Sequence, residues 1–115
     1  MKPFNPLLGE TFELLVPGKY KYFSEQVSHH PPISASITMG DKGYTKYGVF
    51  RQKNKFSGGA LTFINAYNEY ITMDNFGEKF LISPPPLSVH NLIIGQIYVD
   101  ARNRGYIRNL ACPND

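Results

Sequence analysis

The sequence predicts an all-β fold arranged as an antiparallel meander. Short strand-like stretches, about eight in number, are separated by turn signals at regular spacing, which is typical of such folds. The chain contains eight Tyr and eight Phe but no Trp, and a high share of these aromatic residues favours strands over helices. Almost no stretch has a helical pattern.

Composition limits the possible partners. The 115 residues form at most one domain, and 42% of them are hydrophobic, which is enough for a modest core. The net charge of +3 suits an anionic membrane surface or a phosphorylated ligand. The positive charges are scattered, so we expect no nucleic-acid partner. Cys112 is the only cysteine, which excludes an intramolecular disulfide and fits a reducing cytosolic setting. No apolar run approaches the roughly 20 residues of a membrane span and no signal sequence opens the chain, so we expect a soluble protein.

The first elements are marked by proline and glycine. Residues 5–9 fit either a single helical turn, with Asn5 as N-cap and Pro6 in the first helical position, or an irregular turn. Residues 11–16 predict a short strand that Pro17-Gly18 ends. Residues 19–27 alternate loosely, and one face carries two tyrosines followed by Ser24 and Gln26.

The clearest strand covers residues 33–39. Apolar and small polar side chains alternate strictly there, so that Ser34, Ser36 and Thr38 share one face. That polar face either contacts water or, in a closed barrel, lines a cavity where small side chains leave room for a ligand. Residues 40–43 predict a hairpin turn into a strand at 44–53. We expect the next strand at 55–65, with a bulge or a close backbone approach at Gly58-Gly59.

The C-terminal half continues this pattern. Residues 69–73 and 78–82 predict two strands, and the triple proline at 84–86 predicts a rigid connector between strands. Residues 87–94 are apolar, and their length favours a strand. His90 lies within this run, so we expect a structurally satisfied histidine. Residues 96–100 and 106–110 predict a hairpin through 102–105.

The stretch Glu-Gln-Val-Ser-His-His-Pro-Pro at residues 25–32 is the best candidate for a functional site. Proline cannot sit in a central strand, so the chain leaves a strand here and holds His29 and His30 near a sheet edge or barrel rim. Adjacent strand residues point to opposite faces, so both imidazoles reach one ligand only if the backbone bends between them.

Four interpretations of the two histidines remain open. A zinc site needs three or four ligands, and the chain offers only His90 and Cys112 in addition. A catalytic pair with Ser28 lacks a nucleophile elbow. The histidines can also be exposed without a function. Anion recognition is favoured, because imidazole N–H groups donate hydrogen bonds to phosphate.

Two motifs carry a resemblance to a known family. The stretch EQVSHHPP, together with Lys-Pro-Phe-Asn-Pro-Leu-Leu-Gly-Glu at residues 2–10, resembles the signatures of the oxysterol-binding-protein-related (OSBP-related) lipid-transfer family. A weaker similarity continues through residues 54–56, 84–86 and 97–107. It covers most of this chain, whereas the family's lipid-binding domain is several times longer.

The resemblance implies a fold and a function. Residues 1–115 would be a partial lipid-binding domain, a slice of a large incomplete β-barrel that holds one lipid, and the family's N-terminal lid and C-terminal ligand contacts would lie outside these residues. Such a domain is not an enzyme, uses no cofactor or metal, and carries a sterol or phosphatidylinositol 4-phosphate between membranes. Four residues would contact the headgroup, namely Lys2, Asn5, His29 and His30. Lys2 would pair with its charge, the Asn5 side-chain amide would hydrogen-bond to the inositol, and the two histidines would bind the phosphate.

The resemblance also implies a cytoplasmic protein that is peripheral at membranes or membrane contact sites. The open strand edges of a partial barrel predict oligomers or strand swapping. Two other classes remain open, namely a small hydrolase with a histidine base and an interaction module that adds a peptide strand at an open edge.

Overall fold

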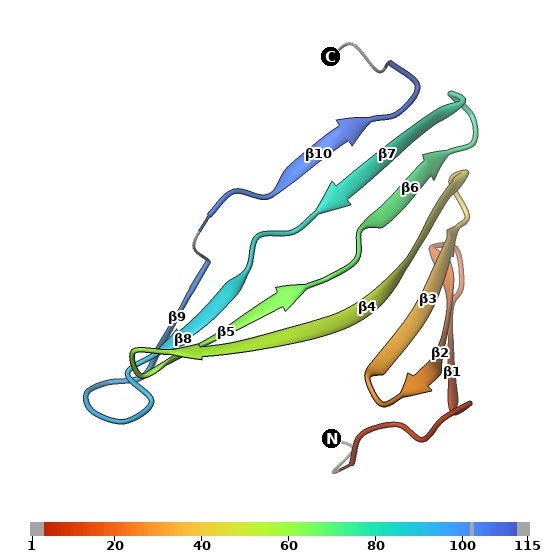
Figure 1. Cartoon of the computed structure of the whole chain (residues 1–115). Helices are drawn as coiled ribbons and strands as arrows, with labels where there is room; N and C mark the ends of the chain where they lie inside the picture. The colour runs from red at the N-terminus through yellow and green to blue at the C-terminus, as the bar shows by residue number, and fades with distance from the viewer. Residues whose placement is uncertain (1–3, 102, 113–115) are drawn as a thin grey trace.

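The computed structural model describes residues 4–101 and 103–112, which form one antiparallel sheet of ten strands (Figure 1). The strands are β1 (Thr11–Val16), β2 (Tyr20–His29), β3 (Pro32–Gly40), β4 (Tyr44–Ser57), β5 (Ala60–Asn65), β6 (Glu69–Met73), β7 (Glu78–Ser83), β8 (Leu87–His90), β9 (Tyr98–Ala101) and β10 (Tyr106–Asn109). No helix in the described ranges has the length and apolar character needed to cross a bilayer. The all-β antiparallel prediction is confirmed, with ten strands in place of about eight.

The sheet divides at the long strand β4. Its first half pairs with β6, from Tyr44 opposite Met73 to Gly48 opposite Glu69. Its second half pairs with β5, from Gln52 opposite Asn65 onwards. One branch continues from β6 to β7 and β10, and the other continues from β5 to β8 and β9 (Figure 1). A single strand therefore links two diverging parts of the sheet.

The register of β2 on β3 confirms the predicted alternation. Ser24 pairs with Ser36, and Gln26 pairs with Ser34. Because paired residues share one face of a sheet, these residues and Thr38 form a small polar surface that we call the serine face. Phe23 and Ile37 pair on the opposite face.

The sheet has no buried apolar core in its described residues. The two side chains that are buried there, Gln26 and Ser88, are both polar, at 4% and 5% exposure. The Cα radius of gyration is 17.0 Å, against about 13 Å for a compact domain of this length. The chain therefore forms an open sheet that does not close on itself.

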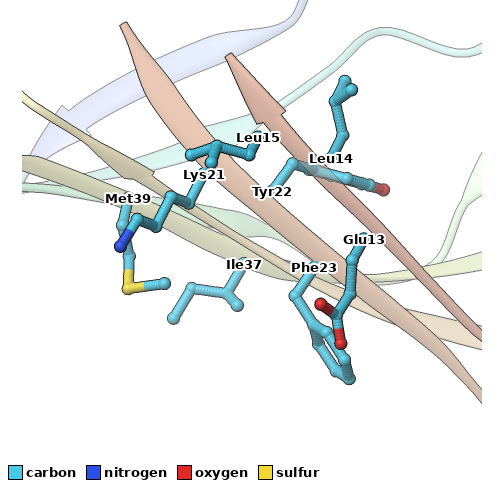
Figure 2. Close-up of a pocket in the computed structure, with 8 residues that line it drawn as sticks. All are labelled: Glu13, Leu14, Leu15, Lys21, Tyr22, Phe23, Ile37 and Met39. Atoms are coloured by element: carbon cyan, nitrogen blue, oxygen red, sulfur yellow. The ribbon is translucent and has the colours of Figure 1, made fainter. Parts of the chain in front are cut away.

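Apolar side chains gather on the face opposite the serine face, where Phe23 and Ile37 are half-buried and Met39 is exposed. A hollow of about 450 Å³ there is lined by Phe23, Ile37 and Met39, with Glu13 and Lys21 at its margins. Figure 2 shows these three apolar side chains on the same side of the ribbon.

Most strand predictions hold, and those for residues 11–16, 33–39 and 69–73 match β1, β3 and β6 closely. Of the two alternatives for residues 5–9, the chain adopts the turn, with Gly9 at a φ of 76°. The three prolines at 84–86 connect β7 to β8, as expected.

The predicted single strand at 55–65 is wrong. Gly58 and Gly59 have φ values of 59° and 76°, and Ser57 pairs with Ala60 across them. Two consecutive left-handed residues make a tight hairpin turn, so the two glycines separate β4 from β5 where a bulge was expected.

The strand predicted at 87–94 is too long. It ends at His90, because Asn91 turns into the left-handed region at a φ of 61°. The Asn91 side-chain amide donates a 3.0 Å hydrogen bond to the Gln96 carbonyl, which closes a loop.

The predicted hairpin between residues 96–100 and 106–110 is also wrong. β9 pairs with β8, whereas β10 pairs with β7. The prolines after β7 carry β8 onto the other branch, so the outer edge of β7 is left for β10. Neighbouring elements in the sequence are therefore not neighbours in the sheet here.

Candidate functional site

The two histidines lie where β2 turns into β3. His29 pairs with Pro32, the first residue of β3, and His30-Pro31 forms the link between the strands, with a cis peptide bond. Proline is tolerated at the first position of a strand, where no ladder hydrogen bond is lost. The prediction that the chain leaves the strand and turns here is confirmed. The expectation that neither proline lies in a central strand is wrong for Pro32, which begins β3 between β2 and β4.

The turn brings both imidazoles together. Their ring centroids are 4.2 Å apart, with an angle of 49° between the ring planes. Both residues are exposed. Consecutive side chains diverge in a regular strand, whereas at this turn the two rings are close enough to contact one small anionic group.

A β-bulge precedes the histidines. Gln26 pairs with Ser34 and Ser28 pairs with Ile33, so Val27 is an extra residue in β2. One added residue reverses which face the following side chains occupy. The bulge thereby sets the direction in which β2 presents the residues that follow it.

Gln26 holds this end of the hairpin together. Its side-chain amide nitrogen donates a 2.9 Å hydrogen bond to the Ser28 carbonyl. Its amide oxygen accepts a 2.5 Å hydrogen bond from the Ser34 hydroxyl. A buried amide needs such partners, and here they fasten the bulge to β3.

The N-terminal motif docks beside the same residue. The Gly9 amide donates to the Gln26 carbonyl at 2.8 Å, and the Gln26 amide donates to the Glu10 carbonyl at 3.0 Å. A Glu10 carboxylate oxygen accepts a hydrogen bond from the Leu7 amide at 2.8 Å, which closes the preceding turn. The two sequence motifs, 23 positions apart at their first residues, are thus adjacent in space.

A hollow of about 250 Å³ lies between the two motifs. Its lining combines Pro6, Glu10 and Phe12 with Gln26 and Ser34 of the serine face. The hollow has polar groups on the serine face and an aromatic ring on β1, which is an arrangement suited to an amphipathic ligand.

The structure brings together two of the four predicted headgroup residues. His29 and His30 are adjacent, as described. Asn5 is exposed at the start of the docked segment, and no hydrogen bond joins it to either histidine among the described residues. Lys2 lies outside the described residues. The predicted four-residue cluster stays a prediction.

His90 lies far from this turn along the sheet, on β8. Its ring stacks on Tyr98, with centroids 4.7 Å apart and 15° between the planes. The expectation that this histidine is structurally satisfied is wrong for one atom, because Nε2 is buried without a hydrogen-bond partner among the described residues.

The described residues contain no group of three or more His, Cys, Asp or Glu that could hold a metal ion. Cys112 is exposed.

Gln26, Ser34 and Glu10 were not predicted as site residues. Gln26 is part of the motif, but its burial depends on the bulge and on the docked N-terminal segment. Ser34 belongs to the polar face of its strand, and only the register shows that it lies opposite Gln26. The strict alternation of apolar and small polar residues in β3 was the sequence signal that pointed to Ser34.

Comparison with known proteins gives a consistent result. The sequence model of the family described as Oxysterol-binding protein matches residues 1–114. The human protein named Oxysterol-binding protein-related protein 3 is 37% identical over 110 residues, which cover 95% of this chain and 12% of that protein. Oxysterol-binding protein-related protein 3B of Arabidopsis thaliana is 38% identical over 100 residues, or 87% of this chain and 22% of that protein.

Solved structures agree with these sequence matches. The Osh3 ORD of Saccharomyces cerevisiae, crystallised in complex with PI(4)P, superposes with a TM-score of 0.87 at 31% identity and covers 95% of this chain. The Osh1 ORD domain in complex with cholesterol superposes with a TM-score of 0.83 at 40% identity and covers 94% of it. This chain spans 29% and 27% of those two chains, respectively.

Proposed function

Because this chain belongs to the oxysterol-binding protein family, a family of lipid-binding proteins and not of enzymes, we propose that it forms part of a domain that carries one lipid between membranes. The described sheet supplies strands of the barrel that encloses the lipid. The protein that contains it works in the cytoplasm as a peripheral protein at membrane surfaces or membrane contact sites.

The ligand classes follow from the similar structures. One of these is a complex with PI(4)P, and two are complexes with cholesterol or ergosterol. We infer that the lipid is a phosphatidylinositol 4-phosphate or a sterol. The small side chains of the serine face support this, since they leave room for a ligand inside a closed domain.

The two histidines hold the headgroup phosphate. The observation that carries this assignment is the 4.2 Å separation of the two exposed imidazole rings at the β2–β3 turn. Each ring offers an N–H group to a phosphate oxygen, and bonds to a charged acceptor are stronger than neutral ones. Lys2 adds a positive charge and Asn5 an amide donor from the motif that docks beside Gln26.

Vesicle binding tests this assignment. The chain is mixed with phosphatidylcholine vesicles, with or without phosphatidylinositol 4-phosphate, and the bound fraction is measured by flotation. His29→Ala/His30→Ala removes two bonds to a charged group, each worth roughly 1.5–3 kcal/mol. We expect the gain in binding due to the phosphoinositide to fall at least about tenfold.

A matched control is Lys42→Ala. Lys42 is exposed in the turn at the opposite end of β3, so its removal changes the net charge without touching the histidines. Its phosphoinositide-dependent gain is expected to match that of the unaltered chain. An equal gain in the double-histidine variant would disprove the headgroup assignment.

A further inference from the structure

The two faces of the sheet differ in charge along the branch that runs from β4 through β6 and β7 to β10 (Figure 1). The register places one row of side chains across these strands, on the face opposite the serine face: Tyr47, Tyr70, Leu81 and Arg108. Lys79 belongs to the neighbouring row of the same face, opposite Thr72. This branch therefore presents two cations, Lys79 and Arg108, on that face.

No acidic side chain in these four strands, all of which the structure describes, shares that face. Glu69 and Glu78 lie on the serine face, where Glu69 pairs with Lys46 at 2.9 Å. Among the described residues, no ion pair joins Lys79 or Arg108 to a carboxylate. The positive charge of the face is therefore not neutralised within the branch.

Tyrosine rings hold two cations of this face in place. The Lys79 ammonium lies 5.6 Å from the ring centroid of Tyr47 and 5.0 Å from that of Tyr70, and the two rings stack at 5.4 Å. A hydrogen bond with Tyr47 raises the pKa of Lys79, so this side chain stays charged. The Arg51 guanidinium lies 5.9 Å from the Tyr67 ring centroid and donates a 3.3 Å hydrogen bond to its hydroxyl.

A hollow of about 490 Å³ opens on this face where the sheet divides. β4 changes its partner from β6 to β5 there, which leaves positions 49–51 without a strand partner on that side. The lining is uncharged and includes Tyr47, Tyr67, Tyr70 and Asn68. We call it the tyrosine hollow. It has room for a large side chain of a partner, and its walls are the tyrosines that hold the two cations.

The acidic side chains of the same face lie on strands outside the branch. They are Glu13 on β1, Glu25 on β2 and Asp100 on β9. Glu25 pairs with Ala35, which lines the tyrosine hollow, so the β2 side of the hollow is acidic. A partner's carboxylates are therefore directed to the other side, toward Lys79 and Arg108.

We propose that this face docks an acidic polypeptide segment, with one aromatic side chain of the segment in the tyrosine hollow and its carboxylates on Lys79 and Arg108. Bonds between charged donors and carboxylates are the stronger class of hydrogen bond. Tyrosine and arginine are enriched at protein–protein interfaces. Tyr67 and Tyr106, which are exposed beside the cations, carry hydroxyl groups and suit a protein surface better than acyl chains. The proposal is independent of the lipid site, which uses the serine face and the histidines.

Fluorescence anisotropy with a fluorescein-labelled peptide, Glu-Glu-Phe-Glu-Glu, tests the charges. Lys79→Met/Arg108→Met removes two charges and keeps unbranched side chains, and we expect the affinity to fall roughly fivefold or more. The matched control is Lys19→Met/Lys42→Met, at two exposed residues in the β1–β2 and β3–β4 turns. Equal affinities of the two variants, or no binding of this peptide by the unaltered chain, would overturn the proposal.

A second test changes the peptide and leaves the protein as it is. Glu-Glu-Gly-Glu-Glu has the same charges and lacks the aromatic ring, and we expect the unaltered chain to bind it roughly tenfold more weakly. Equal affinities for the two peptides would show that the tyrosine hollow is not used, which contradicts the proposal even if the charges matter.

Other partners give different results. If Lys79→Met/Arg108→Met weakens binding to phosphatidylserine vesicles or to a single-stranded oligonucleotide and not to the peptide, the face binds a bilayer or a nucleic acid and the peptide proposal is wrong. His29→Ala/His30→Ala should keep full affinity for the peptide, because the histidines lie outside this face. A failure of the headgroup assignment is thereby distinguished from a failure of this proposal.

Discussion

At the residue scale, Gln26 combines two structural roles, one for its backbone and one for its side chain. Its backbone receives the docked N-terminal segment, and its side chain bonds to β3 and to the bulge in its own strand. The histidines begin three positions later, so the geometry of the turn depends on the hydrogen bonds of Gln26. Gln26 is therefore a positioning residue.

Removing the Gln26 amide should destabilise the protein. Gln26→Ala leaves the Ser34 hydroxyl and the Ser28 carbonyl without their partner, and we expect the free energy of unfolding to fall by about 1–3 kcal/mol. Urea unfolding followed by circular dichroism measures this change. Gln52→Ala, at an exposed glutamine of β4, serves as the control and should change it by less than about 0.5 kcal/mol. Equal stabilities of the two variants would show that the Gln26 bonds contribute nothing net.

The β4–β5 turn decides the shape of a whole element. Gly58 and Gly59 both adopt left-handed φ values, and a Cβ added at Gly58 would meet no atom within 4 Å. If a larger residue at position 58 lowers the free energy of unfolding, the cause is therefore the left-handed backbone conformation and not a steric clash. The Gly59 carbonyl also accepts a hydrogen bond from the Leu92 amide, so this turn supports the loop between β8 and β9.

A pair of substitutions isolates that penalty. Gly58→Val forces a β-branched residue into the left-handed region and should lower the free energy of unfolding by roughly 1–2 kcal/mol or more. Gly58→Asn should lower it clearly less, because asparagine tolerates this region. Thermal unfolding of both variants provides the measurement. Equal losses for valine and asparagine would mean that side-chain volume matters here, contrary to the open space around Gly58.

The open sheet leaves edges and apolar faces exposed at the scale of the whole molecule. β1 pairs on one side only, with β2. Leu15 on this edge strand is 61% exposed. It also borders the hollow of Figure 2, beside the apolar side chains of β2 and β3. Open edges next to apolar surface favour strand pairing between copies.

We therefore expect the isolated chain to self-associate as its concentration rises. Light scattering coupled to size-exclusion chromatography should give a mass above 13.0 kDa. Leu15→Lys places a charge on the edge strand and should shift the mass toward that of one chain. Phe76→Lys, in a turn remote from β1, should not. A single-chain mass at every concentration would contradict this expectation.

The sequence by itself determined the local structure and the motifs. Strict alternation identified β3, and prolines and glycines marked the ends of β1, β2 and β7 correctly, because these signals depend on neighbouring residues and on the φ angles that Pro and Gly prefer. The pair of histidines before the prolines identified the turn in the same way. The two motifs together identified the family.

Tertiary structure alone decided which strands pair and which side chains meet. The division at β4, the separation of β9 from β10 and the burial of Gln26 depend on contacts between residues distant in the sequence. Local preference cannot select among such pairings, because each strand offers the same backbone hydrogen bonds to any partner. The 4.2 Å approach of the two imidazoles and the bond that joins the β8–β9 loop to the β4–β5 turn likewise arise from the folded backbone.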